Sequence, residues 1–145
     1  MIEIATHTEN ILGGEKTLPV PLSSRFNYIR AIEIGLTKIN FDHLKAYTNL
    51  SLETLSELIG ITPRTIQRKA GPDHFKASIS EKMLELADLY SFGYHVFGDK
   101  EKFQKWIESP IKSLDGFKPL NLIYNHYGLE LVRDELGRIQ YGVYS

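Results

Sequence analysis

Hydrophobic residues recur at helical spacing along most of the chain. The clearest stripe lies within 51–59, where Leu52, Leu55, Leu58 and Ile59 fall three or four residues apart. Apolar side chains at that interval share one face of an α-helix. The pattern therefore predicts an all-α protein. Similar spacing or end signals predict further helices near 25–34, 41–47, 80–97, 100–109, 119–124 and 129–139.

A second, shorter helix follows the stripe at 51–59 after a tight turn. Ser51 is placed to cap the first helix and Gly60 to end it, since glycine adopts the left-handed backbone at low cost. Thr62 can then cap the second helix. Pro63 suits its first turn, where the missing N–H would be unpaired in any case. These signals predict a pair of helices joined by a short turn.

The second helix of the pair is predicted to have an apolar side and a basic side. Ile66 and Ala70 lie four residues apart and are expected to face the first helix. Arg64, Gln67 and Arg68 then point away from it, and no acidic residue occurs from 61 to 71. In the DNA major groove, arginine pairs with guanine and glutamine with adenine. This pattern favours a helix-turn-helix recognition helix; a helical hairpin with a solvated basic face is the alternative.

The expected DNA contacts extend past this helix. Lys76 lies in the following loop, within reach of a DNA backbone, and a solvated loop lysine is an equally good interpretation. The residues predicted to contact DNA are Thr62, Arg64, Thr65, Gln67, Arg68, Lys69 and Lys76.

Breaks in the pattern divide the chain into three segments. Residues 1–22 contain adjacent glycines and two prolines but few bulky apolar side chains, which predicts a flexible N-terminal arm with a short strand or contact near 2–4. Residues 23–97 are expected to form the helix-turn-helix bundle. Residues 98–145 follow the break at Gly98 and form a separate helical unit. In the supporting helix at 25–34, the stripe expected to face the core consists of Phe26, Ile29 and Ile32.

Composition narrows the function classes. The formal net charge is −1, so any nucleic-acid contact must come from a local basic patch. The absence of cysteine excludes disulfides and thiol nucleophiles and fits a reducing cytoplasm. The N-terminus lacks a secretory signal, and no apolar run approaches the roughly 20 residues that a membrane span needs. We therefore expect a cytoplasmic protein without membrane association.

The sequence carries no catalytic or metal-binding motif. Its 5 histidines are far apart, and no pair has a metal-ligand spacing such as H-E-x-x-H. Nucleophile-elbow, Walker and dinucleotide fingerprints are also missing. We expect no enzymatic activity, no metal and no cofactor.

The chain end is unusually apolar. Residues 139–145 read IQYGVYS, with two tyrosines and a valine where a frayed end would be polar. Such an end indicates either docking onto a partner, with the terminal carboxylate as an anchor, or folding back onto its own unit. The pattern leaves both interpretations open.

Several segments together resemble one protein family. They are 58–68 (LIGITPRTIQR), 96–99 (VFGD), Trp106-Ile107 with Pro110, Leu114-Asp115-Gly116 with Pro119-Leu120, and 132–145. Almost the whole chain after residue 25 thereby resembles the Xre-type antitoxins that carry an Xre/MbcA/ParS toxin-binding domain and pair with RES-domain toxins. The chain departs from the family at Asp115, where a second glycine is common, and at Lys82, where arginine is frequent.

The resemblance implies an Xre-like helix-turn-helix bundle, then a small helical toxin-binding domain with an extended C-terminal tail. It implies an antitoxin that binds its own operator as a homodimer and represses transcription. The partner would be a cognate RES-domain toxin, a class that degrades NAD⁺, whose active site the tail would block. A plain helix-turn-helix repressor with a C-terminal dimerisation module is the alternative. The implied toxin contacts are Arg138, Gln140, Tyr141, Gly142, Val143, Tyr144 and Ser145.

Overall fold

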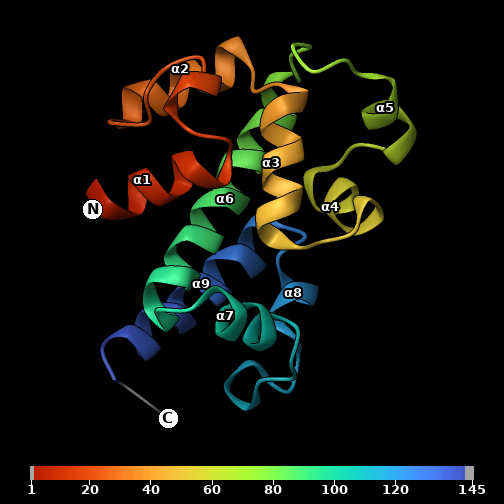
Figure 1. Cartoon of the computed structure of the whole chain (residues 1–145). Helices are drawn as coiled ribbons and strands as arrows, with labels where there is room; N and C mark the ends of the chain where they lie inside the picture. The colour runs from red at the N-terminus through yellow and green to blue at the C-terminus, as the bar shows by residue number, and fades with distance from the viewer. Residues whose placement is uncertain (1, 143–145) are drawn as a thin grey trace. The chain divides into compact units, whose positions relative to one another are not determined.

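The computed structural model describes the backbone of residues 2–142 and the side chains of residues 7–142. Within these ranges the chain forms helices and turns and contains no β-strand, which confirms the all-α prediction (Figure 1). Two compact units result, one ending at Ser91 and the other beginning at Phe92. The division falls inside a long helix, ahead of the Gly98 break where the sequence predicts the boundary.

The first unit is a helical bundle built around the start of that long helix. Caps and glycine breaks begin and end its elements much as the sequence indicates. Its helices are α1 (Ile2–Ile11), α2 (Arg25–Ile34), α3 (Lys38–Thr48), α4 (Leu52–Ile59), α5 (Pro63–Arg68) and most of α6 (Ala77–Phe97), with a 3₁₀ turn, η1, at Glu15–Thr17. Its largest fully buried side chains include Phe41, Leu44, Leu55, Ile59, Met83 and Tyr90.

The N-terminal segment is packed rather than loose. Residues 2–11 form α1, and Ile11 and Leu12 are only 2% and 0% exposed. The side-chain amide of buried Asn40 donates a hydrogen bond to the Leu12 carbonyl at 2.8 Å, joining the end of α1 to α3. The segment is therefore a helix and a packed turn, not the flexible arm or strand that its glycine and proline content predicts. The contact that orders it comes from a residue far along the chain.

The face of helix α2 that packs against the core is not the one that the sequence predicts. Phe26 and Ile29 are 77% and 53% exposed, whereas Ala31 is fully buried. The hydroxyl of Tyr28 donates to Asp88 Oδ1 at 2.7 Å, which anchors the Ala31 side of the helix to α6. The bounds of α2 match the prediction. The expected core stripe is wrong at Phe26 and Ile29, while Ile32 is half-buried, because a polar anchor decides the rotation of the helix.

The second unit packs short helices around an aromatic cluster. After the end of α6 it contains α7 (Lys100–Ile107), a 3₁₀ turn η2 (Lys112–Leu114), α8 (Pro119–Leu122) and α9 (His126–Gln140). Trp106 stacks on Phe103 with ring centroids 6.0 Å apart, and Tyr94 meets Phe103 edge-on at 5.5 Å. Val132 and Leu136 from α9 are fully buried. Trp106 is half-buried, and its ring packs against Phe97 and Phe103 at the edge of this cluster.

Candidate DNA-binding helix and C-terminal segment

Local hydrogen bonds build the helix pair at 52–68 as the sequence predicts. The Ser51 hydroxyl accepts from the Thr54 amide at 3.1 Å and so caps α4. Gly60 ends α4 with a φ of 83°, in the left-handed region. The Thr62 hydroxyl accepts from the Thr65 amide at 3.2 Å and caps α5, with proline in its first turn. These contacts position α5, a helix of 6 residues.

Helix α5 buries one side chain, and the residues of this helix that are predicted to contact DNA are exposed. Ile66 is 2% exposed and packs in the core. Arg64, Gln67 and Arg68 are all exposed, as predicted. Ala70 is also exposed, so its predicted packing against α4 is wrong. The reason is that α5 ends at Arg68 and the backbone becomes extended at the next residue.

The two threonines of the predicted contact set are exposed and bonded to each other. Thr62 Oγ1 and Thr65 Oγ1 lie 2.8 Å apart. Since the Thr62 oxygen also caps α5, its first role is structural. Thr65 lies on the exposed side of the helix with the arginines.

Lys69 and Lys76 differ in their surroundings. Lys69 is half-buried; its Nζ donates to the His74 carbonyl at 3.1 Å and lies 5.1 Å from the centre of the Phe75 ring. Lys76 is exposed, and its carbonyl accepts from the Ile79 amide at 3.1 Å, so that α6 begins at Ala77 instead of the predicted Ser80. Of the two lysines, Lys76 is therefore the exposed one and Lys69 the one held by contacts within its own chain.

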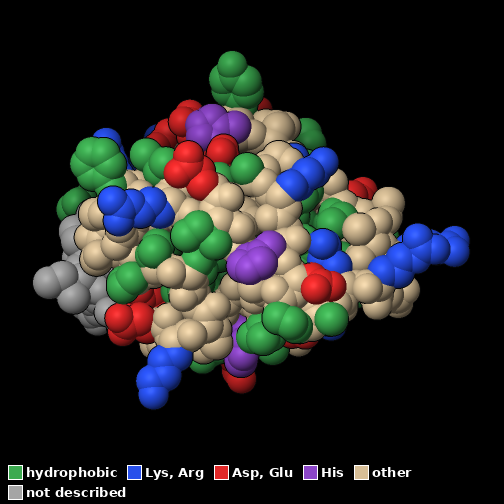
Figure 2. Space-filling model, turned by 90° about the horizontal axis from the view of Figure 1, so that it is seen from above, with side chains coloured by type: hydrophobic (Ala, Val, Ile, Leu, Met, Phe, Trp, Pro, Cys, Tyr) green, Lys and Arg blue, Asp and Glu red, His purple; other side chains and the backbone are tan. Residues whose placement is uncertain are grey.

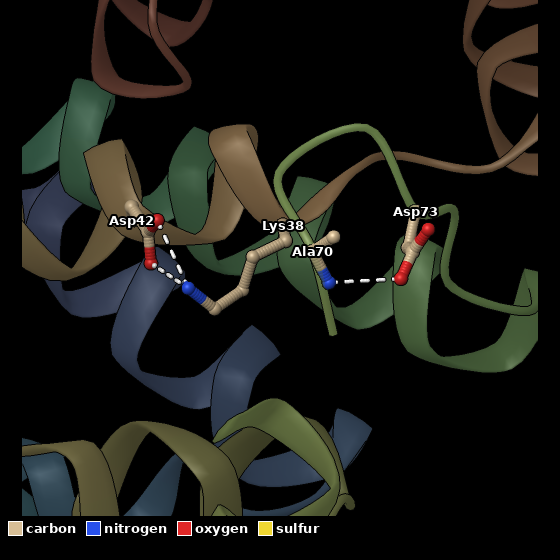
Figure 3. A network of polar contacts seen from close by, with 4 residues as sticks. All are labelled: Lys38, Asp42, Ala70 and Asp73. Carbon is tan, nitrogen blue, oxygen red and sulfur yellow. Dashed lines mark hydrogen bonds and ion pairs between the residues drawn. The ribbon is translucent and has the colours of Figure 1, made fainter. Parts of the chain in front are cut away.

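The loop that follows α5 is attached to the start of α3. The Asp73 carboxylate accepts from the Ala70 amide at 2.8 Å and closes the loop on itself (Figure 3). The Asp73 carbonyl accepts from the Lys38 amide at 3.1 Å. The Lys38 side chain turns away to pair with Asp42 at 3.0 Å. The carboxylate of the acidic residue nearest to α5 in the sequence therefore accepts from one backbone amide of its own loop.

A second set of bonds attaches the same loop to the end of α2. The Phe75 amide donates to the Leu36 carbonyl at 2.7 Å, and His74 Nδ1 lies 2.7 Å from the Gly35 carbonyl oxygen. The Leu36 amide donates to Ser80 Oγ at 2.9 Å. The segment between α2 and α3 thus holds the segment between α5 and α6. Sequence reasoning missed these residues, because their pairing leaves no periodic signal; the one cue is Gly35.

The predicted partner-binding residues begin at the end of α9. Arg138 pairs with the nearly buried Glu135 at 3.2 Å and keeps 48% of its side chain exposed. Tyr141 is 80% exposed, and Gln140 and Gly142 are also exposed. Residues 143–145, the remaining predicted contacts, lie outside the described residues.

A shallow surface depression brings several of these side chains together. The residues that line it are Phe92, Arg133, Asp134, Gly137, Arg138, Gln140 and Tyr141. The guanidinium of Arg133 lies 5.8 Å from the centre of the Phe92 ring. The predicted contacts 138, 140 and 141 therefore share one site on the second unit, in which two arginines and one aspartate accompany two aromatic rings.

Neither a metal centre nor a membrane span is built from the described residues. No group of three or more histidine, aspartate or glutamate side chains among them is placed to hold a metal ion. None of the helices in residues 2–142 is long and apolar enough to cross a bilayer.

Comparison with family models separates the same two units. Residues 29–88 match the antitoxin Xre-like helix-turn-helix domain, which covers α5 and the loop attached to α2. Residues 93–142 match the antitoxin Xre/MbcA/ParS C-terminal toxin-binding domain, which covers the part of the depression that α9 forms.

Two curated relatives align with nearly the whole chain. A protein named Antitoxin Xre from Yersinia enterocolitica serotype O:8 is 25% identical over 132 residues, 90% of this chain and 89% of the relative. A second Antitoxin Xre, from Photorhabdus laumondii subsp. laumondii, is 24% identical over the same shares of both chains.

Proposed function

Because the chain belongs to the Xre-type antitoxin family, we propose that it neutralises a cognate toxin through its second unit and binds its own operator through α5. The observation that carries the DNA half is the surface of α5. One residue, Ile66, holds the helix in the core while Arg64, Gln67 and Arg68 are exposed side by side. That arrangement suits base-edge contacts in a major groove.

The proposed operator complex contains a homodimer and represses the chain's own operon. A helix of 6 residues reads only a few base pairs. Helix-turn-helix proteins gain specificity by pairing two such helices, which read half-sites about 34–36 Å apart or a multiple of that distance. Because a protein must be in the cytoplasm to bind its operator, we propose a cytoplasmic location. We assign it no catalytic role.

The proposed partner is a RES-domain toxin, and residues 138–145 are proposed to block its NAD-degrading active site. The match of residues 93–142 to a toxin-binding domain supports a toxin partner. The exposure of Tyr141 and the half-exposed guanidinium of Arg138 support contacts at the end of α9.

Co-expression with the product of the adjacent open reading frame tests the toxin half. A stop codon in place of Val143 should abolish protection of cellular NAD⁺. The matched measurement is operator binding by the same truncated protein, which should equal that of the full chain because α5 lies in the other unit. Full protection of NAD⁺ by the truncated chain would contradict the proposed role of the tail.

The choice of RES toxin is tested separately by purifying the complex. The adjacent gene product should co-purify with the full chain, and the toxin alone should consume NAD⁺. A partner that co-purifies but leaves NAD⁺ intact would keep the antitoxin assignment and reject the RES assignment. Absence of any partner would favour a plain repressor.

A further inference from the structure

The outward face of α2 carries an unusual set of side chains for a surface helix. Phe26, Ile29 and Ile34 are 77%, 53% and 51% exposed. Arg30 and Glu33 fall between them at helical spacing, so all of these residues share one side of α2. Single exposed apolar residues are ordinary, but a group that follows one helix face marks an interaction surface. Figure 2, seen from above, shows hydrophobic side chains separated by charged ones on this end of the molecule.

We infer that this face of α2 binds α2 of a second copy of the chain, antiparallel and across a two-fold axis. The inference rests on the proposed operator-binding homodimer and locates its interface. In a two-fold interface every contact occurs twice, from residue i to j and from j to i. A surface suited to it must therefore be complementary to itself.

The order of residues along α2 meets that requirement. With the axis level with the midpoint of Ala31 and Ile32, antiparallel helices place Arg30 opposite Glu33 of the second copy. The same register places Ile29 opposite Ile34 of the second copy. Each pair then forms twice, giving a charged centre between two apolar pairs. Arg30 and Glu33 are exposed, and neither makes an ion pair with another described residue.

The connections of α2 explain why this surface serves DNA binding. The residues directly after the helix, Gly35 and Leu36, are bonded to His74 and Phe75 in the loop behind α5. Two copies joined through α2 would therefore hold their recognition helices at a set separation while leaving Arg64 and its neighbours free. A face used for a toxin would have no need for such self-complementarity.

Charge reversal at the two central positions provides the test. Arg30→Glu or Glu33→Arg alone places like charges opposite each other twice, and each should weaken dimerisation on the order of tenfold or more. The double variant restores both pairs and should dimerise like the wild type. A mixture of the two single variants should form a heterodimer in preference to either homodimer. Sedimentation equilibrium, with and without operator DNA, measures all of these.

Glu81→Arg is the matched control, since Glu81 is exposed on α6, outside this face of α2; it should leave dimerisation unchanged. Circular dichroism checks that each variant keeps its helices. Equal dimerisation of both single variants and the wild type would overturn the inference, as would a chain that stays monomeric on its operator. Binding to a single operator half-site tests the recognition helix by itself, and Arg64→Ala should abolish it. Failure of the interface and failure of the DNA function are therefore distinguishable.

Discussion

The Lys69 ammonium donates a hydrogen bond to the His74 carbonyl at 3.1 Å and lies over the Phe75 ring. Lys69, which the sequence predicts to contact DNA, thereby bridges the end of α5 and the loop that follows it. Its contribution is expected to be structural first. The phosphate contact stays a prediction, and it would require the side chain to leave two partners within its own chain.

We predict that Lys69→Ala lowers the free energy of unfolding by about 1 kcal/mol, from the loss of a hydrogen bond and a cation–π contact. Urea denaturation measures this change. Lys76→Ala is the control: its side chain is exposed, so stability should shift by less than about 0.5 kcal/mol. Equal stability of both variants would show that the Lys69 bridge contributes nothing.

Operator affinity should separate base readout from phosphate contact. Arg64→Ala and Gln67→Ala should each cost about 1–3 kcal/mol on the operator and little on scrambled DNA. Lys76→Ala should weaken binding to both DNAs and reduce the slope of affinity against salt by about 1. Fluorescence anisotropy titrations at several salt concentrations measure these effects. Wild-type binding by all three variants would refute the assignment of α5 as the recognition helix.

Gly35→Ala should destabilise the first unit by more than about 2 kcal/mol. The residue has a φ of 98°, and an added Cβ would lie 2.4 Å from the Phe75 carbonyl oxygen. To relieve that contact, the loop that follows α5 would have to move away from α2. Thermal unfolding measures the loss, and hydrogen exchange at the Phe75 amide should rise with it. Unchanged exchange would mean that the loop does not depend on this junction.

Asp115→Gly should raise the free energy of unfolding by about 0.5–1 kcal/mol. Asp115 has a φ of 55°, the left-handed region, in which a side chain is strained and glycine is not. This is also the position where the resembling family commonly has glycine. Asp99→Gly is the contrasting change: Asp99 caps α7 from an extended backbone, so its loss should destabilise by a few tenths of a kcal/mol. A stability loss in Asp115→Gly would contradict the strain argument.

The sequence by itself determined the features that depend on neighbours within a few residues. Ser51, Thr62 and Gly60 cap and end the paired helices through bonds to residues two to four positions away, so their pattern predicts the geometry. The exposed row on α5 follows from the same local periodicity. The apolar chain end was also visible, although Val143–Ser145 lie beyond the described residues.

Tertiary structure decided what depends on distant partners. The rotation of α2 is set by Tyr28 and Asp88, the packing of the N-terminal segment by Asn40, and the direction of Lys69 by the His74 carbonyl. Long-range hydrogen bonds of this kind, buried at Asn40 and part-buried at Tyr28, outweigh a hydrophobic stripe because an unpaired polar group in the core costs more than leaving apolar side chains exposed. Such bonds have no period along the chain, so no reading of hydrophobic spacing predicts which face of α2 remains for a partner.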